Sequence, residues 1–131
     1  MKQLPPGTTG TAVLRVQPEH LANRFKDASL PPVLATPVMI LVMENAALNA
    51  VKPFLESGES AVGIAVDVKH LAATPVGREV RATAAVVGVN GKRIDFQVSA
   101  KDGQEEIGRG THQRIVIDLR SFNERLSRES R

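Results

Sequence analysis

Residues 36–48 read TPVMILVMENAAL, and this apolar run predicts the one long helix of the chain. Thr36 is a residue type that caps helices, and Pro37 suits the first helical position. We expect the helix to reach Lys52, because Pro53 would interrupt it. Its polar residues repeat at the spacing of a single helix face: Asn45, Asn49, Lys52 and Glu56. A helix that is apolar elsewhere has to be covered on most of its circumference.

Glu44 interrupts the apolar surface of this helix. It lies about 100° from the polar stripe, given about 3.6 residues per turn. The residues three and four positions away from it are all apolar: Ile40, Leu41, Ala47 and Leu48. A carboxylate held among aliphatic side chains is costly unless it is paired with a cation or has a chemical role. Glu44 is therefore either a structural partner of a buried Arg or Lys, or a catalytic group.

The composition fits one soluble domain over residues 1–131, with residues 120–131 as a frayed, charged tail. The chain is 42% hydrophobic and 24% charged, which is ordinary for a globular protein. The absence of cysteine excludes disulfides, thiolate catalysis and zinc–thiolate sites. With no Tyr or Trp, four Phe and a net charge of +3, the chain does not favour nucleic acid as a partner.

The N-terminus lacks the apolar run of a signal peptide, and the longest apolar stretch, residues 37–43, is too short to cross a bilayer. We therefore expect a cytoplasmic protein with no membrane partner.

The rest of the chain alternates with the period of β-strands. A first strand is expected near residues 10–16, and a short helix near residues 18–25. After the long helix, apolar residues recur at every second position from Ser60 to His70, which places the His70 side chain inward at the end of its strand. Further strands are expected over 79–89, 93–101 and 105–119, and they are separated by Asn90-Gly91 and Asp102-Gly103, which are signals for tight hairpins.

This order predicts an α+β hotdog fold, in which a curved antiparallel sheet of about five strands wraps around one long helix. Three segments also resemble a known family. They are Ala35-Thr36-Pro37 with Glu44 downstream, VGIAVDVKHLAATPVG at 62–77, and SAKDG at 99–103 followed by EIGRGTHQR at 106–114. Over roughly residues 30–120 the chain is similar to hotdog-fold acyl-CoA thioesterases of the fluoroacetyl-CoA thioesterase type.

The resemblance implies that the protein cleaves an acyl-CoA thioester with a catalytic set of Thr36, Glu44 and His70. It also implies that Gly63 and Arg114 contact the substrate or CoA. The resemblance implies no cofactor beyond the CoA of the substrate, and a homodimer or a dimer of dimers.

This chain differs from the family pattern at Asp27 and Leu30, where the fluoroacetyl-specific member has phenylalanines that form an apolar lid. A general short-chain or aryl acyl-CoA substrate is therefore expected, without selectivity for a fluorinated acyl group.

The chemistry of thioester hydrolysis gives each of these residues a role. A helix N-terminus offers backbone N–H groups to a developing oxyanion, and Thr36 lies there. Glu44 lies roughly 12 Å further along the axis, at about 1.5 Å per residue, so the acyl carbon would occupy the gap between them. We expect the partner subunit to supply part of the site, and His70 to move a proton or orient the carboxylate. Whether Glu44 attacks the carbonyl or activates water or Thr36 stays open.

Each of these residues also has a purely structural interpretation. Thr36 is a common helix cap, and a histidine at a strand end such as His70 is usually satisfied by neighbours. Gly63 suits close packing of two backbones. The alternation of its strand allows Arg114 to lie on the face that points to solvent. His112 has no second ligand at metal spacing.

Three functions compete with thioester hydrolysis. The first is an acyl-CoA sensor without catalysis, the second a hotdog dehydratase, and the third a structural or interaction protein. Glu44→Ala separates the first from the enzyme, because a sensor would keep its ligand affinity. A dehydratase gives the threonine at the helix start no clear role, and a structural protein leaves Glu44 unexplained.

Overall fold

The computed structural model describes residues 1–129 and contains one five-stranded sheet packed on one long helix. The chain also contains two short 3₁₀ helices, at Pro18–His20 and Lys52–Phe54. The named elements, in chain order, are β1 (Thr9–Arg15), α1 (Ala22–Phe25), α2 (Thr36–Val51), β2 (Glu59–His70), β3 (Glu79–Asn90), β4 (Arg93–Asp102), β5 (Glu105–Asp118) and α3 (Leu119–Glu129).

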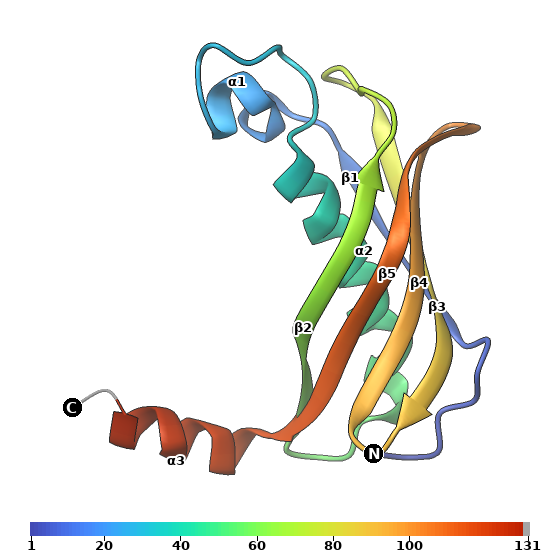
Figure 1. Cartoon of the computed structure of the whole chain (residues 1–131), viewed down its shortest axis with the longest axis vertical. Coiled ribbons are helices and arrows are strands. Elements are labelled where there is room, and N and C mark those ends of the chain that lie inside the picture. The colour runs from blue at the N-terminus through green and yellow to red at the C-terminus, as the bar shows by residue number, and fades with distance from the viewer. Residues whose placement is uncertain (130–131) are drawn as a thin grey trace.

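The sheet is antiparallel throughout and has the order β1-β3-β4-β5-β2. Its strands curve around α2, which runs along the inner face of the sheet (Figure 1). The hotdog architecture expected from the sequence is therefore confirmed, including the helix start at residue 36 and its end beside Lys52.

The core lies between α2 and the inner face of the sheet. Met39 and Met43 on α2 and Phe96 on β4 are among its largest fully buried side chains. Small residues let β1 pass close to the helix, because a Cβ at Gly10 would overlap the backbone of Ala46 and Ala50. The buried residues of α2 are Val38, Met39, Val42, Met43, Ala46, Ala47, Ala50 and Val51.

Both predicted hairpins are present. In each, two residues connect the strands, and the first of the two is a glycine with positive φ: 63° at Gly91 and 62° at Gly103. Asn90 and Asp102 themselves are the last paired residues of β3 and β4. Glycine adopts this backbone conformation without a steric penalty, which explains why these positions make tight turns.

β2 is an edge strand, and this changes the surroundings of its aliphatic residues. The alternation predicted that Ile64 and Val66 would point inward with Val62 and Val68, but they are 50% and 40% exposed. The prediction was wrong for two reasons. The register shifts at a bulge between Gly63 and Ala65, and no further strand of the described chain covers this edge.

The C-terminal segment also differs from the expected frayed tail, because residues 119–129 form α3. The Asp118 carboxylate accepts hydrogen bonds from the Ser121 N–H at 3.0 Å and the Ser121 hydroxyl at 2.8 Å. This is an N-cap. The helix projects away from the sheet (Figure 1), and none of its described residues is buried. Residues 130–131 of the predicted tail lie outside the described residues.

Within residues 1–129 no helix is long and apolar enough to span a bilayer.

Candidate active site

Thr36 lies at the start of α2, but its hydroxyl does not cap the helix. Ala35 is the N-cap residue and provides no side-chain hydrogen bond. The Thr36 hydroxyl is instead 2.8 Å from Nδ1 of His70, which lies 34 positions later at the end of β2. The interpretation of Thr36 as a plain helix cap is therefore wrong, because the hydroxyl is used in a contact between two elements.

His70 has one engaged ring nitrogen and one free one. Its Nε2 is buried and has no hydrogen-bond partner among the described residues. Burial lowers the pKa of His70 below its ordinary value of 6.5, and the backbone of Ala72 opposes this shift. The ring is therefore mostly neutral at pH 7. A buried polar atom without a partner is uncommon in folded proteins.

A cavity of about 450 Å³ opens beside Thr36 and His70. Most of its lining is aliphatic, and Lys26 is the one charged side chain in that lining among the described residues. Leu30, one of the two departures from the family pattern, contributes to this wall. Asp27, the other, does not, because its carboxylate accepts bonds from the Ser29 N–H at 2.9 Å and the Ser29 hydroxyl at 2.7 Å.

A larger hollow of about 600 Å³ lies on the sheet, lined by β2 to β5 residues such as Asp67, Thr83 and Ser99. None of the predicted site residues lines it. Of the two, the smaller cavity is the one that the predicted residues Thr36 and His70 line.

Glu44 lies at the border of the buried face of α2 rather than inside it. Its side chain is 37% exposed, so the expectation of a carboxylate fully enclosed by aliphatic residues was wrong. Leu41, one turn earlier, is itself 50% exposed. The Glu44 Oε2 is 4.0 Å from the Arg114 Nη1, a loose ion pair that leaves the carboxylate accessible.

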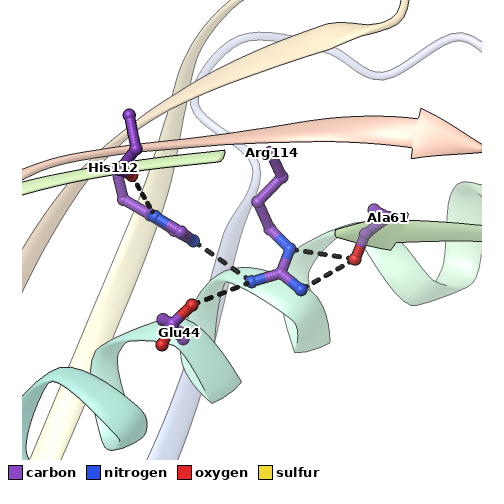
Figure 2. A network of polar contacts seen from close by, with 5 residues as sticks. Glu44, Ala61, His112 and Arg114 are labelled. Atoms are coloured by element: carbon purple, nitrogen blue, oxygen red, sulfur yellow. Dashed lines mark hydrogen bonds and ion pairs between the residues drawn. The ribbon is translucent and has the colours of Figure 1, made fainter. Parts of the chain in front are cut away.

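Arg114 is buried, so the alternative that its side chain points to solvent is wrong. Its Nε and Nη2 donate to the Ala61 carbonyl at 3.2 and 2.7 Å, and its Nη1 points toward Glu44 (Figure 2). Burial lowers the pKa of the Arg114 guanidinium, and the nearby Glu44 carboxylate raises it. Arg114 therefore presents its charge to the inner face of the sheet, beside Glu44.

Gly63 provides the space that Glu44 occupies. A Cβ at this position would lie 2.8 Å from the Glu44 Oε2 and 3.3 Å from the His112 Cε1. The backbone of β2 thus approaches the carboxylate more closely than any residue with a side chain would allow.

The structure brings the predicted residues together as two groups. Thr36 contacts His70, and Glu44 lies with Arg114 and Gly63. Among the described residues, no hydrogen bond or ion pair links Glu44 to Thr36 or His70.

His112 was overlooked in the sequence, where it was considered only as a metal ligand. His112 lies two positions before Arg114, so both side chains point to the same, inner face of β5, and this spacing could have indicated His112 from the sequence. Among residues 1–129, no cluster of three His, Cys, Asp or Glu side chains could hold a metal ion.

Comparison with known proteins identifies the family. Residues 16–120 match the model of a family described as fluoroacetyl-CoA-specific thioesterase. The chain belongs to this thioesterase family. One relative is the fluoroacetyl-CoA thioesterase of Streptantibioticus cattleyicolor, which is 46% identical over 103 residues, covering 79% of this chain and 74% of the relative.

Solved structures of the thioesterase family share the fold. One structure of a fluoroacetyl-CoA thioesterase has a TM-score of 0.91 at 39% identity, covering 97% of this chain and 98% of the other. Another, a variant in complex with fluoroacetate and CoA, has a TM-score of 0.85 at 41% identity, covering 90% and 98%. A Thermus thermophilus protein described as a thioesterase superfamily member has a TM-score of 0.92 at 30% identity, covering 99% and 96%.

Proposed function

We propose that this thioesterase hydrolyses the CoA thioester of a small acyl group and that Thr36, Glu44 and His70 carry the reaction. The observation that carries the proposal is the Thr36–His70 hydrogen bond at the wall of an apolar cavity. A serine or threonine hydroxyl bonded to a neutral imidazole is an arrangement that supports nucleophilic or general-base chemistry. Family membership and the CoA complex of a relative support the substrate class.

The reaction replaces the carbon–sulfur bond of the thioester by a carbon–oxygen bond from water, and the leaving thiolate takes up a proton. The Thr36 N–H has no acceptor among the described residues, so it is available to the developing oxyanion. With the Thr36 O–H donated to Nδ1, the neutral His70 ring carries its own proton on the buried Nε2, and Nδ1 can take up the Thr36 proton and later pass it to the leaving sulfur. In this proposal Glu44 acts on the acyl carbon, either as nucleophile or as the base for water or Thr36.

Gly63 and Arg114 are proposed to contact the substrate. Because Arg114 is buried beside Glu44, we assign its contact to the acyl end of the substrate rather than to the CoA phosphates. No cofactor is proposed other than the CoA that the substrate carries.

The acyl group that we propose is a short aliphatic or aryl one. Where the fluoroacetyl-specific family member has lid phenylalanines, this chain has Asp27, which bonds to Ser29, and Leu30, which lines the cavity. A single aliphatic residue leaves more room over the acyl end than two aromatic rings. We therefore expect no preference for fluoroacetyl-CoA over acetyl-CoA or larger acyl groups.

We propose that two chains associate through β2. An edge strand with exposed backbone groups and with Ile64 and Val66 open to solvent is a pairing surface. Such a dimer would place the partner subunit beside Glu44, because Gly63 belongs to the same strand. Size-exclusion chromatography with light scattering tests this, and a monomer at micromolar concentration would contradict it. Pairing of dimers and a cytoplasmic location remain predictions from the sequence.

The decisive experiment is a thiol-release assay with a panel of acyl-CoAs, run on the wild type and on Glu44→Ala. We expect turnover by the wild type and loss of turnover in Glu44→Ala, with both binding the acyl-CoA. Binding without turnover by the wild type for every acyl group would favour the sensor over the enzyme.

A further inference from the structure

His112 on β5 is a buried side chain with both ring nitrogens engaged (Figure 2). Its Nδ1 is 2.8 Å from the Ala65 carbonyl oxygen, and its Nε2 is 3.1 Å from the Arg114 Nη1. The ring also stacks on Phe96, with centroids 5.7 Å apart and planes 24° from parallel. The imidazole is therefore fixed by two hydrogen bonds and by one packed face.

The chemistry of the two partners determines where the proton of His112 resides. A guanidinium has only donors, so Nε2 must accept the Arg114 N–H. A carbonyl oxygen only accepts, so Nδ1 must carry the proton that it donates to Ala65. A doubly protonated ring would turn an N–H toward the Arg114 N–H and lose this bond. Burial lowers the pKa of His112, and the charge of Arg114 acts in the same direction, against the Ala65 carbonyl and Glu44.

The bulge in β2 makes this arrangement possible. The register shifts between Gly63, which is opposite Arg114, and Ala65, which is opposite Gln113. The carbonyl of Ala65 is thereby within reach of the His112 ring, and the missing side chain of Gly63 leaves room for its Cε1.

We propose that His112 is a positioning residue: its neutral ring, protonated on Nδ1, fixes the Arg114 guanidinium beside the Glu44 carboxylate. This inference rests on the proposed function, in which Glu44 takes part in the hydrolysis. The Ala61 carbonyl holds one side of the guanidinium through Nε and Nη2. His112 accepts one Nη1 hydrogen and leaves the second available to Glu44, 4.0 Å away. Arg114 is thus held from two sides before any substrate arrives.

The first test reads the ring directly and does not depend on turnover. The chain has three histidines, so a long-range ¹H–¹⁵N spectrum of the histidine-labelled full chain can be assigned with His112→Asn. At pH 7.5 we expect a neutral His112 with its proton on Nδ1. A proton on Nε2, or on both nitrogens, would overturn the inference.

The second test uses two substitutions that each keep one half of the ring's hydrogen bonding. His112→Asn keeps a donor near the Nδ1 position for Ala65 but cannot reach Arg114. His112→Gln places an amide oxygen near the Nε2 position, where it accepts from Arg114. Because hydrogen bonds to charged groups are the stronger ones, we expect His112→Asn to lower kcat/KM by about tenfold. His112→Gln should recover most of this loss.

Thermal midpoints of both variants show whether each remains folded, and the Arg114 side-chain N–H resonance reports the guanidinium itself. That resonance should broaden in His112→Asn and return in His112→Gln. Equal activity of the two variants, or an unchanged Arg114 resonance in both, would contradict a positioning role. A wild type without turnover would defeat the proposed function, whereas the ring spectrum would still decide the state of His112.

Discussion

At the scale of single residues, the candidate site depends on contacts between side chains that are far apart in the sequence. Thr36 and His70 meet because β2 ends beside the first turn of α2, and their polar atoms lie 2.8 Å apart. The sequence indicated both residues through a family resemblance, but not this bond, because strand placement is a property of the whole sheet. The hydrogen bond of His112 to the Ala65 carbonyl was unpredictable for the same reason, because Ala65 lies on another strand, whereas Arg114 lies only two positions away on the same strand.

The Thr36 hydroxyl is expected to be needed for the reaction. Thr36→Val removes the hydroxyl at similar volume, and we expect kcat/KM to fall by about a hundredfold, as for a lost acid–base partner. Thr36→Ser keeps the hydroxyl and should retain most of the activity. Thiol-release kinetics on both variants make the comparison. Equal losses in the two would mean that the side chain only packs.

Gly63 offers a sharper test of the space around Glu44. The Cβ of Gly63→Ala would lie 2.8 Å from the Glu44 Oε2, so the carboxylate has to move. We expect kcat/KM to fall at least about tenfold, the effect of roughly 1.4 kcal/mol in a barrier. Gly88→Ala is the matched control, because a Cβ there meets nothing within 4 Å. If both alanine variants kept full activity, the Glu44 position would be irrelevant to turnover.

At the scale of elements, sequence patterns were sufficient to predict the elements that depend only on residues close together in the sequence. The strands followed from alternation, and the hairpins followed from Gly91 and Gly103, whose positive φ angles need no knowledge of the rest of the fold. Alternation failed at Ile64 and Val66, because a bulge and an uncovered edge depend on the neighbouring strand and on any partner. The helix α3 was missed although its cap, Asp118 with Ser121, is readable in the sequence.

The cap makes a prediction for α3. Asp118→Ala removes the acceptor of both Ser121 bonds and should destabilise the helix by about 1 kcal/mol. Far-UV circular dichroism should show lost helix signal, while Asp118→Asn keeps a capping oxygen and should lose less. Because no described residue of α3 is buried, thiol release should stay unchanged. A large loss of activity in Asp118→Ala would instead place α3 in the site.

At the scale of the whole molecule, two histidines connect stability to pH. Burial lowers the pKa of His70 and of His112 below the ordinary value of 6.5. In the unfolded chain both titrate near that ordinary value, so below it the unfolded state binds more protons than the folded state. The free energy of unfolding should therefore be at its full value above about pH 6.5 and should decline as the pH falls toward the lowered folded values.

Urea unfolding at pH 7.5 and pH 5.5 measures this decline. Carboxylates with a lowered pKa, such as Asp27 and Asp118, act only in a more acidic window, since their ordinary value is 3.8. His112→Asn removes one of the two rings, so its free energy of unfolding should fall less steeply between the two pH values. Identical slopes in the wild type and the variant would show that His112 is not held neutral by the fold.

We propose that the fold supports one reaction, in which Glu44 acts on a thioester held beside Thr36 and His70. The most direct measurement is single-turnover thiol release by Glu44→Gln, with acyl-CoA binding measured on the same sample. Glutamine keeps the size of the side chain beside Gly63 and Arg114 but removes the charge. We expect wild-type binding with thiol release slowed by at least about a hundredfold. Release at the wild-type rate would contradict it.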